Sequence, residues 1–294
     1  MAGGAVISTP KTNVHTGCEV WGVLNVTPDS FSDGGQHDKQ DSALARAERM
    51  LVEGADVIDV GGESTRPKGT YGEGYAHVGA AEELSRVLPV VSQLVRVGAR
   101  VSIDTVKAEV ASACLSQGAA IVNDVSCGAS KELLQAVASH DAELVLMHNR
   151  NHGEVTDENS RYDDVVEDVR SELLAAVSRA TRVGVRSDKI WLDPGIGFAK
   201  TPHQCALVLG SLSRLVDTGH RVLVGSSRKS FIAALAPNAN ATKPATSERL
   251  GGTAASVALA VQQGAAAIRV HDIAMMRQAA LIALALRGEA GDVA

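Results

Sequence analysis

The feature that most constrains this fold is a unit that recurs along the whole chain. Each unit is a short apolar run that ends in polar residues or glycine, followed by a stretch with helical periodicity. Apolar runs this short, bounded by Gly and Pro, are typical of strands buried on both faces. The eight runs are Val20–Val26, Asp56–Val60, Arg100–Ile103, Ala120–Val125, Glu143–Met147, Lys189–Leu192, Arg221–Val224 and Ala267–Val270.

The segments between these runs are predicted to be amphipathic helices. In the first, apolar residues recur at helical spacing and charged residues occupy the opposite face. Several of these segments end in a glycine, which can adopt the left-handed conformation that stops a helix. The predicted helices include Ser42–Glu53, Ala81–Val97, Tyr162–Val183 and Ser256–Gln263, and the stop glycines are Gly54, Gly98, Gly118, Gly184 and Gly264.

Eight such units in 294 residues predict an α/β fold, a single-domain (β/α)8 TIM barrel formed by residues 19–288. Residues 1–18 would form an N-terminal extension and residues 289–294 a C-terminal tail. The alternative is a doubly wound open sheet. The chain has no GxGxxG after its first run, and polar residues follow almost every run instead of one switch point. Both observations favour the barrel, because all eight strand ends then ring one mouth.

Two connections are long for loops between a strand and a helix, which usually have about 2–6 residues. They are Asn25–Asp38, after the first strand, and Gly61–Gly74, after the second. Long loops at the mouth of a barrel are candidate lids over an active site.

Composition excludes several classes of protein. Only 3% of residues are aromatic while 45% are hydrophobic, so the core must be mainly aliphatic. Net charge is 28 − 34 = −6 and no long basic tract occurs, so we expect no nucleic-acid partner. Four cysteines without a CxxC pair indicate reduced thiols in a cytoplasmic protein. We also expect no membrane partner, since neither a signal peptide nor a run of 18 apolar residues is present.

Three polar residues at neighbouring strand ends form a candidate recognition surface: Asp104, Asn123 and Asp193. Two carboxylates and an amide can accept hydrogen bonds from the ring N–H and NH2 groups of a pterin or guanine-like heterocycle. For any one of them, a helix N-cap is an equally good interpretation. Three around one mouth favour the binding site.

Cationic residues gather after the last two strands, where barrels commonly bind phosphate. Ser226–Ser230 (SSRKS) opens a helix, Arg269 and His271 follow the last strand, and Arg66 could join them from the second loop. The alternative is ordinary surface Lys and Arg. An anionic substrate group is the better explanation for cations at strand ends.

The sequence offers no evident nucleophile. Cys127 has no base placed beside it, and His148 is as well explained by a structural hydrogen bond as by catalysis. A metal site rich in His or Cys is not apparent. The composition fits Mg2+ held mainly by substrate phosphates with one protein oxygen, such as that of Asn25.

Eight motifs in chain order resemble those of the dihydropteroate synthase family, from about Trp21 to Arg287. They are NVTPDSFSDGG (Asn25–Gly35), DVGGESTRP (Asp59–Pro67), VSIDT (Val101–Thr105), NDVS (Asn123–Ser126), LMH (Leu146–His148), LDPGIGFAK (Leu192–Lys200), VGSSRKS (Val224–Ser230) and IRVHD (Ile268–Asp272). The stretch Asn149–Asn151 and Lys68 depart from the commoner pattern.

The resemblance implies a homodimeric TIM-barrel transferase of folate biosynthesis that sulfonamides inhibit. Its members condense 6-hydroxymethyl-7,8-dihydropterin diphosphate with p-aminobenzoate to give 7,8-dihydropteroate and diphosphate. By motif, the implied pterin ligands are Asp104, Asn123, Asp193 and Lys229, and Asn25 would bind Mg2+. The implied diphosphate ligands are Thr65, Arg66, Arg269 and His271, and the p-aminobenzoate pocket would contain Phe31, Pro67, Phe198 and Ser227.

In the implied mechanism diphosphate departs first and leaves a cation on the pterin methylene. Asp104, Lys229, Arg269 and His271 are then catalytic, and we add Asp33 on the first loop as a second stabiliser of the cation. The alternatives are a pterin-binding methyltransferase and an inactive pterin-binding homologue. The first would not need the SRK and RVHD motifs, and the second would show damaged catalytic loops.

Overall fold

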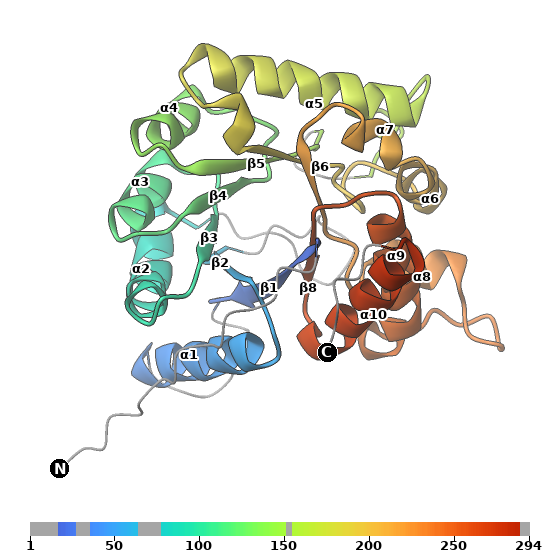
Figure 1. Cartoon of the computed structure of the whole chain (residues 1–294), viewed down its shortest axis with the longest axis horizontal. Helices are drawn as coiled ribbons and strands as arrows, with labels where there is room; N and C mark the ends of the chain where they lie inside the picture. The colour runs from blue at the N-terminus through green and yellow to red at the C-terminus, as the bar shows by residue number, and fades with distance from the viewer. Residues whose placement is uncertain (1–16, 28–35, 64–77, 151–154, 289–294) are drawn as a thin grey trace.

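The computed structural model describes residues 17–27, 36–63, 78–150 and 155–288. Eight parallel strands follow one another in sequence order around a closed barrel, which rules out the open sheet (Figure 1). The strands are β1 (Glu19–Asn25), β2 (Val57–Gly61), β3 (Val101–Asp104), β4 (Ile121–Asp124), β5 (Glu143–Met147), β6 (Ile190–Asp193), β7 (Arg221–Val224) and β8 (Ala267–Val270).

Helices surround this barrel, as the alternating pattern predicts (Figure 1). The described helices are α1 (Gln36–Val52), α2 (Ala80–Arg96), α3 (Ala108–Ser116), α4 (Lys131–Ser139), α5 (Val165–Arg182), α6 (Pro202–Gly210), α7 (Ser213–Val216), α8 (Ser230–Leu235), α9 (Leu250–Gln262) and α10 (Ile273–Leu286), with 3-10 turns at Ser187–Lys189 and Thr246–Arg249.

The predicted strands agree with the observed ones to within a residue or two at each end, but three helices begin elsewhere. The predicted helix Ser42–Glu53 begins earlier, at Gln36. The predicted helix Tyr162–Val183 begins at Val165, because the Asp164 side chain caps the backbone N–H groups of the first turn. α9 begins at Leu250, earlier than the expected Ser256. Its first turn contains Gly252, where a Cβ would lie 2.2 Å from Ile232. Glycine is a poor helix former, so the sequence pattern places the start of α9 too late. Close packing against Ile232 is the reason for a glycine at this position.

The five predicted stop glycines all have positive φ, between 80° and 106°. Gly54 also permits a close contact, since a Cβ there would lie 2.7 Å from the side chain of Arg277. None of the described helices is long and apolar enough to cross a membrane.

The lower half of the barrel interior contains a layer of apolar side chains that includes two fully buried tryptophans. Trp21 on β1 and Trp191 on β6 meet edge to face, with ring centroids 5.4 Å apart. Below them, towards the amino ends of the strands, charged residues form a connected group. Arg100 pairs with Glu19 at 2.8 Å and with Glu143 at 2.6 Å. This charged floor lies at the amino ends of the strands, opposite the end at which the predicted site residues gather.

Candidate active site

The upper half of the barrel interior holds three buried acceptor groups on adjacent strands. They are Asp59 on β2, Asp104 at the end of β3 and Asn123 on β4. Asp104 and Asn123 are register partners on neighbouring strands. The Oδ1 atom of each of the three is buried without a hydrogen-bond partner within the described part of the chain. Buried acceptors are rarely left unpaired, so the three point to a ligand with N–H donors.

Arg269 on β8 crosses the barrel to two of these carboxylates. Its Nε lies 2.5 Å from Asp59 Oδ2, and its Nη2 lies 2.8 Å from Asp104 Oδ2. Asp59 Oδ2 also accepts from Asn123 Nδ2 at 3.2 Å. The guanidinium therefore neutralises part of the buried negative charge, and only its remaining donors can reach an anionic ligand.

Burial raises the pKa of Asp104 to about 7, against the opposing attraction of Arg269. The nearby negative charge of Asp59 raises it further. Because a ligand with N–H donors stabilises the charged carboxylate, its binding would return Asp104 to the ionised form.

None of the three predicted recognition residues caps a helix. The N-cap of α3 is Lys107, that of α4 is Ser130 and that of α6 is Thr201. The N-cap interpretation of Asp104, Asn123 and Asp193 is therefore wrong, and their burial at strand ends needs another reason.

Asp193 and Lys229 lie side by side at the next part of the mouth. A Cβ at Gly225, at the end of β7, would be 3.8 Å from both Asp193 Oδ2 and Lys229 Nζ. Asp193 Oδ1 accepts from the Gly195 N–H at 2.7 Å, which leaves Oδ2 as the acceptor that faces Lys229. Lys229 Nζ also stands 4.7 Å from the centre of the Phe198 ring. Burial raises the pKa of Asp193 and lowers that of Lys229 to about 8.

The loops after β7 and β8 are tied together at the predicted anion site. Ser227 Oγ accepts from the His271 N–H at 3.2 Å and lies 3.0 Å from His271 Nδ1. Arg228 makes a two-pronged pair with Asp272, so it holds the loops together instead of facing the mouth as a free cation. The helix opened by SSRKS, α8, has only six residues. Its dipole therefore adds less to anion binding than the sequence pattern predicts.

Asn25 ends β1 beside Gly61, across from Asp104. A Cβ at Gly61 would lie 3.7 Å from Asn25 Oδ1 and 3.8 Å from Asp104 Oδ2, so this glycine leaves room between two hard oxygen donors. The described residues contain no cluster of His, Cys, Asp or Glu that could cage a metal by itself. An amide oxygen with room beside it fits Mg2+, which keeps most of its ligands from water and substrate phosphates.

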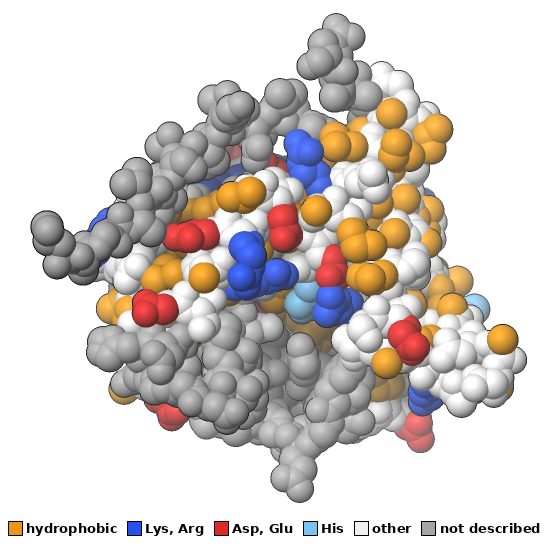
Figure 2. Space-filling model, turned by 90° about the horizontal axis from the view of Figure 1, so that it is seen from below, with side chains coloured by type: hydrophobic (Ala, Val, Ile, Leu, Met, Phe, Trp, Pro, Cys, Tyr) orange, Lys and Arg blue, Asp and Glu red, His pale blue; other side chains and the backbone are white. Residues whose placement is uncertain are grey.

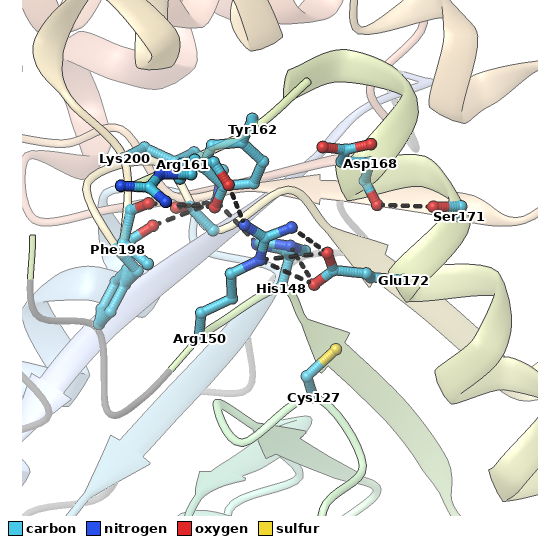
Figure 3. Close-up of polar contacts among 12 residues, drawn as sticks. Cys127, His148, Arg150, Arg161, Tyr162, Asp168, Ser171, Glu172, Phe198 and Lys200 are labelled. Atoms are coloured by element: carbon cyan, nitrogen blue, oxygen red, sulfur yellow. Dashed lines mark hydrogen bonds and ion pairs between the residues drawn. The ribbon is translucent and has the colours of Figure 1, made fainter. Parts of the chain in front are cut away.

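His148, at the end of β5, is not available to a substrate. The residue is fully buried, its Nε2 lies 3.1 Å from Glu172 on α5 and its Nδ1 lies 2.8 Å from Lys200 (Figure 3). Burial lowers its pKa to about 4, so the ring is neutral at pH 7. The structural interpretation of His148 is the correct one. Cys127 is likewise buried, and burial raises its thiol pKa.

The sequence pattern assigned no role to two functional candidates, although it placed Asp59 among the polar residues at the strand ends. Asp59 lies inside β2, and only the structure shows that it joins Asn123 to Arg269. Lys200 is only the last residue of a motif in the sequence, yet it is among the most deeply buried side chains. Predicted site residues on the two long loops lie outside the described residues; they are Phe31, Asp33, Thr65, Arg66 and Pro67.

The barrel is closed, and buried oxygen atoms that lack hydrogen-bond donors among the described residues lie on adjacent strands at its mouth. Together these features define a class of (β/α)8 protein that binds a flat, nitrogen-rich heterocycle. Consistent with this, residues 21–271 match the family described as "Pterin binding enzyme". A dihydropteroate synthase of Staphylococcus haemolyticus is 42% identical over 259 residues, which cover 88% of this chain and 91% of the relative.

Two solved structures share the fold closely. The dihydropteroate synthase of Clostridium difficile, determined in the presence of pteroic acid, superposes with a TM-score of 0.83 at 39% identity, covering 92% of this chain and 96% of that one. The Xanthomonas albilineans enzyme with 4-aminobenzoic acid gives a TM-score of 0.82 at 38% identity, covering 92% and 93%. The chain belongs to the dihydropteroate synthase family, as the eight motifs predicted.

Proposed function

We propose that this protein condenses 6-hydroxymethyl-7,8-dihydropterin diphosphate with p-aminobenzoate, giving 7,8-dihydropteroate and diphosphate. The observation that carries this proposal is the set of three unpaired buried acceptors, Asp59 Oδ1, Asp104 Oδ1 and Asn123 Oδ1. The amino-pyrimidinone edge of a dihydropterin presents several N–H donors and would satisfy them. The pteroic acid and 4-aminobenzoic acid bound to relatives support the same pair of substrates.

The pterin would enter the barrel edge first. Asp104 and Asn123 would accept from its N–H donors on one side, and Asp193 Oδ2 would accept on the other. Lys229 Nζ, beside Asp193, would donate to a ring acceptor such as the carbonyl oxygen. The Trp21–Trp191 pair below stops the ring from passing deeper.

The reaction would begin with cleavage of the bond between the pterin methylene carbon and the diphosphate oxygen. The electron pair leaves with diphosphate, and the methylene cation is delocalised into the ring. Asp104 and Asp193 place negative charge near this cation, while Arg269 and His271 would attract the departing anion. Thr65 and Arg66 are the proposed partners from the second loop.

Asn25 is the residue we propose to hold Mg2+ together with the diphosphate. When bound, the ion supplies positive charge that stabilises the leaving group.

The amine of p-aminobenzoate would then attack the methylene carbon, forming a C–N bond and releasing one proton. Phe198 and Ser227 at the mouth, with Phe31 and Pro67, are the proposed walls of its pocket. Asp33 is our candidate for stabilising the cation or the new ammonium group. Unchanged kcat in Asp33→Ala would remove it from the mechanism.

Release of diphosphate tests the proposal directly. We expect release from the pterin diphosphate that depends on p-aminobenzoate and on Mg2+, and that stops when a chelator is added. Release without the amine would contradict the condensation, and pterin binding without any release would indicate the inactive homologue. Retained activity under the chelator would contradict the Mg2+ assignment alone.

We also propose that the protein acts as a homodimer through α9 and α10. Exposed apolar side chains recur on one face of α10 at Met275, Ile282 and Leu286, and Leu259 is exposed on neighbouring α9. Figure 2 shows hydrophobic side chains gathered on the right of that view, the side on which α8, α9 and α10 lie in Figure 1. Contiguous apolar patches of this kind mark association sites.

Sedimentation velocity tests the dimer. Ile282→Asp should shift the protein to monomer, whereas Val52→Asp, a charge placed on an even more exposed apolar residue of α1, should not. Dimers that persist in Ile282→Asp would place the interface elsewhere. We further propose a cytoplasmic location, which the four buried cysteines support because all of them are reduced thiols.

A further inference from the structure

Lys200 is a buried lysine whose donors are all used. Its Nζ lies 2.8 Å from His148 Nδ1 and 3.2 Å from the backbone oxygens of both Gly195 and Phe198 (Figure 3). Three acceptors thus match the three hydrogens of an ammonium group. Burial lowers the pKa of Lys200 to about 7. A buried amine is costly unless its polar hydrogens are paired, so this arrangement has a strict geometry.

Residues 195–198, whose first and last carbonyls are these two acceptors, form the turn on which Lys229 rests. Ile196 O accepts a hydrogen bond from Lys229 Nζ, and the Phe198 ring lies 4.7 Å below the same nitrogen. At Gly197 a Cβ would stand 3.1 Å from Lys229 Cδ, so the turn is built to let this side chain approach. Both ends of the turn are bound by the single buried amine of Lys200.

His148, which contacts Lys200, is in turn held by Glu172 on helix α5, outside the barrel. Glu172 can only accept, so the His148 proton is on Nε2 and Nδ1 must accept from Lys200. The turn is also pressed against the end of β5. A Cβ at Gly195 would stand 1.9 Å from His148 O, and His148 N donates to Asp193 O at 2.8 Å.

We propose that Lys200 is a positioning residue: its contacts with His148 and with both ends of the 195–198 turn fix where Lys229 and the Phe198 ring meet the substrates. The inference rests on the proposed function of Lys229 in that reaction. Lys200 itself touches neither substrate, because its amine has no donor left for one.

The test compares Lys200→Met, which keeps an unbranched side chain but removes all three donors, with the wild type. We expect kcat/KM for p-aminobenzoate to fall about 100-fold, the effect of misplacing a catalytic group by roughly 1 Å. The KM for the pterin diphosphate should rise less, because only the Lys229 donor is displaced and the acceptors on β3 and β4 are untouched. Lys200→Gln, which retains two donors, should recover part of the loss.

A second readout does not depend on turnover. Acylation of Lys229 Nζ by a water-soluble active ester, followed by peptide mass spectrometry, reports whether this amine still rests on Ile196 O. We expect severalfold faster labelling in Lys200→Met. The matched control is Arg100→Met, which removes an equally well-paired cation from the barrel floor and should change neither labelling nor kinetics.

Unchanged labelling and kinetics in a folded Lys200→Met protein would overturn the proposal and leave Lys200 a purely structural residue. If that variant does not fold, Lys200→Gln and Glu172→Ala carry the test, since Glu172 is half-exposed and its loss frees His148. Normal labelling and kinetics in both would likewise overturn it. A wild type without amine-dependent release would refute the proposed reaction, whereas the labelling result would still decide the role of Lys200.

Discussion

Both ends of the barrel interior contain charged residues, but they differ in hydrogen bonding. Among the described residues, the buried side-chain atoms at the floor have partners, whereas several at the mouth do not. At the floor, Glu143 accepts from Arg100 at 2.6 Å and from the indole N–H of Trp191 at 2.7 Å, and it forms an ion pair with Arg221 at 2.8 Å. Glu19 similarly accepts from Arg100 and from the Trp21 N–H. In the described part of the chain, no side-chain atom of this floor is buried without a partner.

At the mouth, Asp59, Asp104 and Asn123 each leave one buried oxygen unpaired. An unmet buried acceptor costs about 1–3 kcal/mol, so the folded protein carries an energetic penalty there that a ligand can relieve. The difference teaches that charge inside a barrel does not by itself indicate function. The grouping of unpaired acceptors on adjacent strands at the mouth is the better indicator.

Among substitutions at the two ends of the barrel, Asp104→Asn should reduce activity most. The amide keeps the shape but loses the negative charge opposite the pterin cation, so we expect kcat/KM to fall by about 100-fold or more. The free energy of unfolding should stay within about 1 kcal/mol or rise, because a buried charge is removed while Asp59 still pairs with Arg269. Diphosphate release and urea unfolding measure the two effects. If the variant keeps its turnover but loses several kcal/mol of unfolding free energy, then Asp104 has a structural role and not a catalytic one.

Glu143→Ala is the corresponding change at the floor. It removes the acceptor shared by two arginines and a tryptophan, and we expect a loss of about 2 kcal/mol in unfolding free energy for this partly exposed cluster. Turnover should stay within about twofold, because the Trp pair separates the floor from the substrates. Glu158→Ala, on the exposed surface, is the control. Loss of turnover in Glu143→Ala well below its melting temperature would contradict the separation of the two ends.

The pH dependence of stability should have opposite signs at the two ends. Although burial raises the pKa of Glu143, bonds from Trp191 and Arg100 leave it lowered from 4.5. Its stabilisation is therefore complete above that value and is lost as the pH falls through the lowered pKa. The pKa of Asp104 is raised from 3.8 to about 7. Between these values the folded state binds more protons than the unfolded state, so stability falls as the pH rises.

Urea unfolding as a function of pH separates these contributions. Relative to Glu143→Gln, the wild type should lose stability as the pH falls below about 4.5. Relative to Asp104→Asn, it should lose stability as the pH rises from about 4 to about 7. The difference in unfolding free energy should change with pH in opposite directions for the two variants. A change in the same direction for both would contradict the prediction.

Arg221→Lys should give the smallest effect. The arginine lies over the Trp191 ring, with Cζ 4.0 Å from its centre, and also pairs with Glu143. Lysine keeps the charge but loses the flat stacking group, so we expect about 0.5–1 kcal/mol of destabilisation in thermal or urea unfolding. A larger loss would mean that this cation–π contact matters more than the ion pair.

Most of the fold was predictable from the sequence. A strand buried on both faces must be apolar throughout, and a helix must carry one apolar face, so the order of residue types alone predicts the eightfold alternation. The stop glycines were equally predictable, because few other residues adopt the required positive φ. Failures occurred where packing overrode local preference, as at Gly252 inside the first turn of α9.

The candidate site was predictable only in part. Asp104, Asn123 and Asp193 could be picked out because polar residues directly after apolar runs are conspicuous. The sequence did not distinguish a cap from a ligand, since both use the same residue types at the same place. It also gave His148 two equal interpretations, which the neighbouring Glu172 and Lys200 resolved.

The sequence by itself determined the repeat, the barrel and the family, since these depend on periodicity and on short local motifs. The tertiary structure alone decided which polar atoms are satisfied. Arg269 meets Asp59 across 210 positions of chain and Asp104 across 165, and Lys200 meets His148 across 52. Closure of the barrel sets the two contacts of Arg269, because only a closed sheet brings its first and last strands together. The pairing of β5 with β6 brings Lys200 to His148.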